Sequence, residues 1–312
     1  MEDRINIHRD WERRDCPTCG KNDIKNKVVY RGKLPAESQS YYLVKKSFYG
    51  LSNKKFFFSY HRCLKCRQIY CPYYFNPTQL QECYQDMPDN LMGAEKRIAT
   101  VNQRNYALDV TRRLERRPYN YLEFGPDLSL FTVELIKMIE VKKIYLVEPN
   151  KRVHSEIHKA LNSFKSYEIS STLEDSSAQQ IDLCVAIHVL DHLLEPSYVL
   201  NEIHKRLSTE SQFAVVIHNE NSFLRKLLKS FWPPFCLQHP QIYNKKTVSR
   251  LLKDHGFDVN RISRTKNYIK LDNLLNNLFE VFGFKLRVKP SKFWPTLPFY
   301  FGNILILSSK PG

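Results

Sequence analysis

The sequence predicts an α/β fold, in which a parallel sheet carries helices on both faces and is preceded by a small cysteine-bearing module. Short apolar runs alternate with amphipathic stretches between residues 119 and 262, as strands alternate with crossover helices. One run, Ile181–Ile187, is almost entirely apolar, which is typical of a strand covered on both faces. Two closely spaced cysteine pairs near the N-terminus predict the separate module.

The length and charge of the chain limit its class. The 312 residues can hold one sizeable core and a small additional module. The first 14 residues are highly charged and no apolar run reaches about 18 residues, so we expect a soluble, cytoplasmic protein without a transmembrane segment. The net charge of +16 favours anionic partners. Residues 245–312 hold 13 Lys and Arg against 4 Asp and Glu, so this end is the expected basic surface.

The pattern of apolar residues divides the chain into three parts. Residues 1–89 form the predicted zinc-binding module, residues 90–264 the α/β core, and residues 265–312 a basic, aromatic extension that includes the last strand of the core. A helix over 93–114 leads into the core, and the stretch between 262 and 304 is expected to be irregular. The predicted strands are 119–124, 144–147, 167–169, 181–187, 213–217, 257–262 and 304–307, and the further helices are 128–139, 151–161, 196–207 and 247–254.

The cysteine pairs Cys16-Pro-Thr-Cys19 and Cys63-Leu-Lys-Cys66 are two C-x-x-C motifs. Each can place two thiolates on one metal ion, and four thiolates complete a tetrahedral zinc site. Such a site has no open coordination position, so we assign zinc a structural role. The 43 intervening residues exceed the usual spacing and must form structure of their own. A redox C-x-x-C motif and coincidence are the alternatives.

The residues that follow the first two core strands suggest a nucleotide-like ligand. In an open parallel sheet, ligands lie across the carboxyl ends of the strands. Gly125 follows the first strand, where a glycine lets the backbone approach a ligand closely. Glu148 follows the second strand, 25 residues after Glu123, where a carboxylate can accept hydrogen bonds from ribose hydroxyls. A solvated loop glutamate is the alternative, and the missing G-x-G-x-x-G motif disfavours a nicotinamide cofactor.

These motifs together resemble a known family. They are Cys16/Cys19, Arg62-Cys63-Leu-Lys-Cys66 followed by Asn76-Pro77 and Tyr84, Glu123-Phe-Gly125, Val147-Glu148-Pro149, and Leu190-Asp191-His192 with Pro196. Over nearly its whole length the chain resembles class I S-adenosylmethionine-dependent methyltransferases, and within them sugar and small-molecule tailoring enzymes with an N-terminal paired-cysteine zinc module. The resemblance implies a Rossmann-like sheet. It also implies that Glu123, Gly125 and Asp127 line the methionine end of the cofactor, Glu148 its ribose, Ser171 and Thr172 its adenine, and His188 with His192 the floor of its pocket.

Histidines are the candidates for catalysis. His239, in Gln238-His239-Pro-Gln-Ile-Tyr243, follows the fifth strand, where the related enzymes carry a His followed by an aromatic residue. In similar sugar C-methyltransferases that His removes a proton next to a keto group. His192 is the second candidate base, although a lone His is often structural. His218 and Tyr243 are expected to line the site, and residues 231–235 to form its wall.

The predicted reaction is methyl transfer to a small molecule: a sugar, a nucleotide-sugar or a glycan precursor. The basic C-terminal part could bind phosphates of such an acceptor, contact a membrane surface peripherally, or simply be solvated. Phosphate contacts combined with aromatic stacking also bind single-stranded RNA, so an RNA methyltransferase is the first alternative. The second is a zinc-containing scaffold that keeps the fold without catalysis.

Overall fold

The computed structural model describes residues 7–21, 27–48, 56–85, 94–281, 284–291 and 293–312. Its centre is a seven-stranded sheet in the order β10-β9-β8-β11-β12-β17-β14. The first five of these strands are parallel, and β17 runs antiparallel between β12 and β14. The predicted Rossmann-like α/β fold is therefore confirmed. The strands are β8 (Asn120–Phe124), β9 (Lys143–Val147), β10 (Tyr167–Ser170), β11 (Ile181–Ile187), β12 (Leu207–His218), β14 (Asp258–Arg264) and β17 (Asn303–Ser309).

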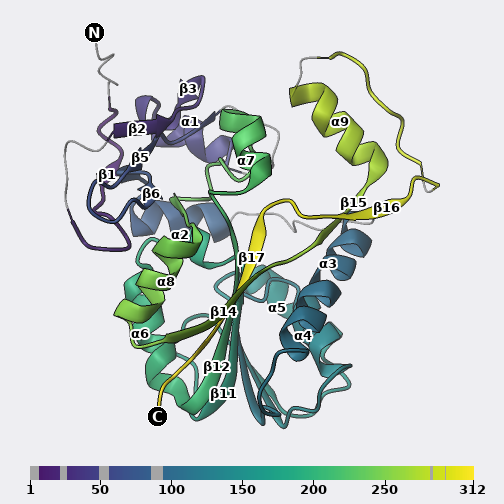
Figure 1. The fold of residues 1–312 in the computed structure, drawn as a ribbon. Coiled ribbons are helices and arrows are strands. Elements are labelled where there is room, and N and C mark those ends of the chain that lie inside the picture. The colour runs from purple at the N-terminus through teal and green to yellow at the C-terminus, as the bar shows by residue number, and fades with distance from the viewer. Residues whose placement is uncertain (1–6, 22–26, 49–55, 86–93, 282–283, 292) are drawn as a thin grey trace.

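Helices cover both faces of this sheet (Figure 1). One face packs against α6 and α8, and the other against α3, α4 and α5. Local sequence explains several helix starts: Pro196 occupies the first turn of α6, and Asn244 and Thr247 form a reciprocal capping box at α8. The helices are α3 (Ala94–Thr111), α4 (Leu130–Ile136), α5 (His154–Ala160, preceded by a 3-10 turn, Lys151–Val153), α6 (Pro196–Arg206) and α8 (Lys245–Asp254).

Two predictions need correction. The helix expected over 128–139 is only Leu130–Ile136, because left-handed backbone at Asp127 and Ser129 delays its start. The prediction that the stretch between 262 and 304 is irregular is wrong. In the structure β15 (Asn267–Lys270) pairs with β16 (Thr296–Phe299), and α9 (Leu271–Val281) lies between them in the chain. Pro298 is tolerated in this two-stranded antiparallel sheet because proline is accepted in edge strands. Gly93, the expected start of the leading helix, lies outside the described residues.

The N-terminal part packs around an aromatic cluster that also takes residues from the core. Trp232, Phe235 and Ile242 are buried in it beside Phe57 and Tyr74. Strand β13 (Gln241–Ile242) adds to the N-terminal sheet, whose order is β13-β6-β5-β2. Two short pairs, β1 with β7 and β3 with β4, complete this part together with α1 (Tyr41–Lys46) and α2 (Pro77–Gln85). Its strands are β1 (Glu12–Arg13), β2 (Lys27–Tyr30), β3 (Leu34–Pro35), β4 (Phe56–Phe57), β5 (Tyr60–Arg62), β6 (Ile69–Tyr70) and β7 (Tyr73–Tyr74).

Among the helices of the described residues, none combines the length and the apolar character needed to cross a membrane.

Candidate active site

The carboxyl ends of the five parallel strands meet at one edge of the sheet. The register pairs Phe124 with Val147 and Val147 with Ser170. The residues that follow these strands, including Gly125 and Glu148, therefore lie at the same edge. On the other side of β8, the ends of β11 and β12 complete the edge. Parallel α/β sheets bind their ligands in this position.

Glu148 ties the loop after β8 to the end of β9. The backbone N–H of Asp127 donates to its Oε2 atom at 2.8 Å, and the N–H of Asn150 donates to Oε1 at 2.8 Å. Burial raises the pKa of Glu148, and these two N–H groups oppose that rise. A carboxylate oxygen can accept more than one hydrogen bond, so both oxygens retain capacity for a ligand.

Gly125 is required by both its backbone and its surroundings. Its φ of +72° lies in the left-handed region, and a Cβ atom there would lie 2.7 Å from Cγ2 of Val189. Asp127 and Ser129 also adopt positive φ, so the loop turns tightly before α4.

We expect Gly125→Ala to lower the free energy of unfolding by about 1–3 kcal/mol, because a strained φ and a clash with Val189 act together. Chemical denaturation measures the change. Gly20→Ala is the matched control: Gly20 has a φ of +62°, but nothing lies within 4 Å of its added Cβ. An equal loss in the two variants would show that the Val189 contact contributes nothing.

Glu123 and the Ser171–Thr172 turn have different surroundings at this edge. Glu123 is buried, and its Oε2 accepts hydrogen bonds from the hydroxyls of Tyr121 and Thr132. Burial raises the pKa of Glu123 to about 7. The side chain therefore links β8 to α4. Ser171 and Thr172 follow β10 directly, next to Glu148, whose N–H donates to Ser170 O at 2.9 Å.

Four imidazoles gather where β11 and β12 end. The rings of His188 and His218 stack with centroids 4.6 Å apart, and His218 lies 5.2 Å from the ring of His239. Nε2 of His239 lies 3.1 Å from Nε2 of His192, whose Nδ1 is 2.9 Å from the Tyr84 hydroxyl. The structure thus brings the two predicted base candidates into direct contact.

A cavity of about 450 Å³ adjoins this histidine cluster. Its walls are mainly apolar. They come from the segment before β13, including Trp232, and from α9 and the adjacent strand β15. The polar groups that line it are His218, His239 and three asparagines, Asn102, Asn267 and Asn303. His188 and His192 lie behind these groups. Of the predicted wall 231–235, residues 231–234 are part of the lining and Phe235 is buried in the N-terminal aromatic cluster, whereas the contribution of α9 was not anticipated.

His188, Asp191 and His218 offer potential metal ligands within 4.8 Å of one another. The two rings, however, stack with an angle of 26° between their planes. Imidazole binds metal through a lone pair in the plane of the ring, so near-parallel stacked rings cannot both reach one ion without rotating. This arrangement does not fit a metal site.

The four paired cysteines do converge. Cys16, Cys19, Cys63 and Cys66 place their sulfur atoms within 4.8 Å of one another, although 43 residues separate the two pairs. The Sγ atoms of Cys16 and Cys66 are 3.4 Å apart, and those of Cys19 and Cys63 are 3.7 Å apart. Tyr70 packs against the cluster. The other four cysteines lie elsewhere, and Cys184 is buried in β11.

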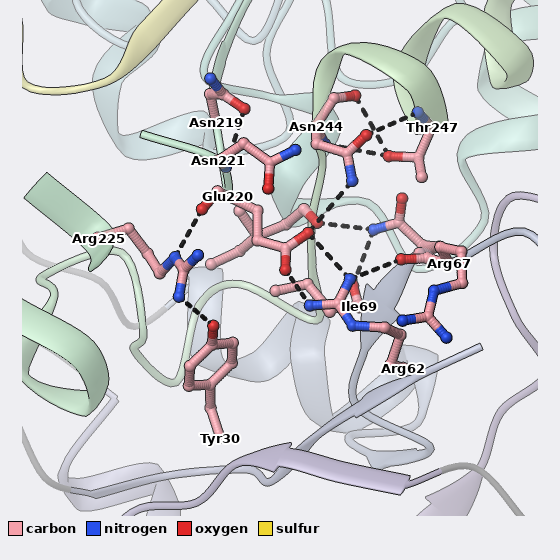
Figure 2. A network of polar contacts seen from close by, with 12 residues as sticks. Tyr30, Arg62, Arg67, Ile69, Asn219, Glu220, Asn221, Arg225, Asn244 and Thr247 are labelled. Carbon is pink, nitrogen blue, oxygen red and sulfur yellow. Dashed lines mark hydrogen bonds and ion pairs between the residues drawn. The ribbon is translucent and has the colours of Figure 1, made fainter. Parts of the chain in front are cut away.

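An ion pair at the end of β12 joins the N-terminal part to the core (Figure 2). The Arg62 guanidinium contacts both carboxylate oxygens of Glu220, which is 1% exposed. Asn244 Nδ2 also donates to that carboxylate at 3.2 Å. The Glu220 carbonyl accepts from Arg225, which in turn contacts the Tyr30 hydroxyl. This network holds the segment between β12 and α7 (Phe223–Leu228), and Leu224 and Leu228 of α7 line the cavity.

Sequence reasoning missed the polar residues beside the histidines. Tyr106 comes from α3, Asn267 from β15 and Asn303 from β17, and their side chains meet in one hydrogen-bonded group. None of them belongs to a motif with a fixed spacing. The antiparallel return of β17 beside β12 brings Asn303 opposite His218, and only the sheet topology could reveal that.

Comparison with known proteins agrees with this architecture. Residues 98–262, more than half of the chain, match the family described as "Methyltransferase domain". No curated protein sequence is similar enough to this chain to count as a match. The pyocyanin biosynthetic protein PhzM is similar in structure, with a TM-score of 0.51 and 12% identity over 74% of this chain and 61% of that one.

Two further solved structures align at lower TM-scores. The N-methyltransferase NodS from Bradyrhizobium japonicum WM9, in complex with S-adenosyl-l-homocysteine, has a TM-score of 0.46 and 14% identity over 75% of this chain and 98% of that one. A methyltransferase from Bacillus halodurans C-125 has a TM-score of 0.46 and 12% identity over 66% and 99%. On the family match, the chain belongs to the methyltransferase domain family and is a class I S-adenosylmethionine-dependent methyltransferase.

Proposed function

We propose that this protein transfers the methyl group of S-adenosylmethionine to a small-molecule acceptor bound in the apolar cavity. The observation that carries the proposal is the position of the cavity, which is lined by His218 at the end of β12 and so adjoins the sheet edge where Glu148 lies. Bound S-adenosylmethionine supplies an electrophilic methyl group. The protein would contribute by orienting the acceptor, excluding water and removing a proton.

Glu148 is the proposed ribose ligand, because its carboxylate is held in place by two N–H donors and retains acceptor capacity. Gly125 and Asp127 would lie near the methionine end, with Glu123 supporting their loop through Thr132. Ser171 and Thr172 would flank the adenine, and His188 and His192 would lie beneath the cofactor. These roles come from the resemblance and from their shared sheet edge.

We expect Glu148→Gln to raise the Kd for S-adenosylhomocysteine by roughly 10- to 100-fold, because hydrogen bonds to a charged acceptor contribute about 1.5–3 kcal/mol. Calorimetric titration measures the change. Glu168→Gln is the matched control: Glu168 on β10 also accepts loop hydrogen bonds, from Ser176 and Ser177. An unchanged Kd in Glu148→Gln would remove the ribose assignment.

The four-cysteine cluster is the proposed structural zinc site. In a tetrahedral site with Zn–S bonds of about 2.3 Å, the sulfur atoms lie about 3.8 Å apart. The Cys16–Cys66 and Cys19–Cys63 separations of 3.4 and 3.7 Å are close to that spacing. Four thiolates would fill the coordination shell, so the ion would stabilise the N-terminal part and take no part in methyl transfer.

The walls of the cavity constrain the acceptor. They expose mainly indole, phenyl and leucine side chains, and their polar groups are two imidazoles and three side-chain amides. A sugar acceptor, as the sequence predicts, would therefore carry an apolar portion, as a lipid-linked glycan precursor does. His239 and His192, the two bases predicted from sequence, and His218 are the candidates to remove the acceptor proton.

The C-terminal part is a proposed peripheral contact with an anionic membrane surface. Lys285, Arg287 and Lys289 are exposed together with Phe284 and Leu286. Exposed basic and apolar side chains in one segment favour an anionic interface. The segment follows α9, whose Leu274 and Leu278 line the cavity, so an apolar acceptor could enter from there. Lys292, counted with this basic stretch in the sequence, lies outside the described residues.

The experiment that tests the proposed function measures S-adenosylhomocysteine formation by the full-length protein in the presence of candidate acceptors. The panel holds nucleotide-sugars, a lipid-linked glycan precursor, apolar phenols and single-stranded RNA. We expect product with a small molecule that has an apolar portion. Product with RNA alone, with a rate that falls steeply as salt rises, would instead support the RNA alternative. Absence of cofactor binding would support a non-catalytic scaffold.

A further inference from the structure

Two imidazoles line the cavity, and their hydrogen bonds give them different chemistry. Nδ1 of His239 lies 2.7 Å from the carbonyl oxygen of Pro234. Because a carbonyl only accepts, Nδ1 carries a hydrogen. The other ring nitrogen of His239 lies 3.1 Å from His192. Both nitrogens of His239 are therefore already engaged within the protein.

His218 is held in the tautomer that carries its hydrogen on Nδ1 and leaves the lone pair on Nε2. Its Nδ1 lies 2.9 Å from Oδ1 of Asn303. The contacts of that amide direct its oxygen toward His218: Nδ2 of Asn303 donates to Oδ1 of Asn267 at 3.0 Å and to the Tyr106 hydroxyl at 3.1 Å, and it lies 3.2 Å from Nε2 of His188. Nδ1 of His218 must then be the donor to Asn303. Nε2 consequently keeps its lone pair, on a ring that lines the cavity.

The groups that face His218 favour its neutral form. Burial is the largest effect, and His188, His239 and His192 add to it, so the pKa of His218 lies well below its usual value. The Asp191 carboxyl group accepts the backbone N–H of His218, and burial raises its pKa to about 7. Trp232 contacts the ring edge-on.

His239 has the opposite bias. Burial lowers its pKa, but Cys236, whose Sγ lies 3.4 Å from Nδ1, and the Asp191 carboxylate outweigh burial and raise the pKa to about 9. At neutral pH, His239 therefore holds a proton on both nitrogens, whereas His218 is neutral and keeps a lone pair on Nε2.

We infer that His218 is the general base of the proposed methyl transfer, that Asn303 is its positioning residue, and that the acceptor is an apolar molecule presenting a hydroxyl or amine to Nε2. This inference rests on the proposed function and specifies its site. The apolar walls select the body of the acceptor, and the neutral imidazole selects a protic nucleophile.

The reaction balances without a further reactant. The acceptor O–H or N–H bond breaks, and its proton passes to Nε2 of His218. The lone pair of the acceptor forms a bond to the methyl carbon while the methyl C–S bond breaks, and that electron pair stays on sulfur. Methylated acceptor and S-adenosylhomocysteine are released, and the imidazolium of His218 returns its proton to solvent.

The first test needs no acceptor. Long-range ¹H–¹⁵N NMR of the full-length protein, with signals assigned by loss in His218→Asn and His239→Asn, reports the tautomer and charge of each ring. We expect neutral His218 with hydrogen on Nδ1, and protonated His239, at neutral pH. In Asn303→Leu the His218 tautomer should no longer be fixed. A charged His218, or hydrogen on its Nε2 in the wild type, overturns the inference.

The second test uses 2-naphthol as the apolar probe and UDP-glucose as the polar one. We expect 2-naphthol to be methylated, kcat to fall about 10²- to 10⁴-fold in His218→Asn, and the Kd for S-adenosylhomocysteine to stay unchanged. Asn303→Leu should lower kcat less and alter the pH profile. His158→Asn, which changes an exposed imidazole bonded to Tyr167, is the control and should match the wild type.

The pH profile separates the two histidines. A base whose pKa is lowered stays active as pH falls, so with His218 the rate should be constant from neutral pH upward and decrease only on the acid side of about 6.5. With His239 as base, the rate would rise until pH about 9. A rise to pH 9, or methylation of UDP-glucose but not of 2-naphthol, overturns the inference. Failure to bind S-adenosylhomocysteine would instead reject the proposed function itself.

Discussion

Replacing Arg62 with methionine should lower the free energy of unfolding by about 3 kcal/mol, the lower end of what removing one partner of a buried ion pair costs. The variant leaves the Glu220 carboxylate, 1% exposed, with Asn244 as its remaining side-chain donor in Figure 2. The Arg62 side chain is 17% exposed, so some water reaches the pair. The expected loss is therefore at the lower end of that range. Urea denaturation of the full-length protein measures the change.

Arg116→Met is the matched control for that variant. Arg116 pairs with Glu210, but both side chains are about 60% exposed, so we expect a loss of only about 0–1 kcal/mol. The double variant Arg62→Met/Glu220→Leu should be more stable than Arg62→Met, because it removes the buried charge that the single variant leaves without its partner. If Arg62→Met and Arg116→Met destabilise the protein equally, the ion pair does not join the two parts as described.

Cys63→Ser should produce the other large effect. We expect bound zinc to fall from about one ion per chain to none, since the remaining three thiolates form a weaker site. Cys63 is fully buried and packs with Tyr70, whose strand β6 pairs with β13. Loss of the ion should therefore loosen the N-terminal sheet and expose its aromatic cluster. Metal analysis and near-ultraviolet circular dichroism on one sample follow both changes.

Cys71→Ser controls for the loss of a buried thiol in the same part of the chain. Cys71 is 1% exposed, and its Sγ donates to the carbonyl of Phe58, a bond that a serine hydroxyl can also make. This variant should retain its zinc and its aromatic signal. Zinc content of one ion per chain in Cys63→Ser would contradict the assignment of the four cysteines.

The parallel part of the sheet could be predicted because its signals are local. Ile181–Ile187 is apolar except for Asp182, and the structure gives β11 the same bounds. The cysteine pairs were recognisable from their spacing alone, and they do converge. Strand β12 begins at Leu207, well before the predicted start at Phe213. The prediction missed residues 208–212 because they are polar and give no apolar signal.

The cavity could not be predicted, because it is built from segments far apart in the chain. α9 has an apolar stripe that includes Leu274 and Leu278, but the aromatic and proline residues around it hid that periodicity. The tautomer of His218 depends on Asn303, 85 residues away, and on the antiparallel placement of β17. No spacing rule connects such residues, so sequence favoured His239, which stands in a recognisable motif.

Titration of the purified protein with S-adenosylhomocysteine in a calorimeter shows whether the carboxyl ends of the strands bind the methyl-donor cofactor. Methyl transfer at the carboxyl ends of the strands predicts saturable binding of one molecule per chain. The expected Kd is in the micromolar range, which corresponds to a binding free energy of about −8 kcal/mol. The same binding should be weakened in Glu148→Gln and kept in Glu168→Gln. No binding by a folded protein would contradict the account and leave a scaffold that has the fold without the reaction.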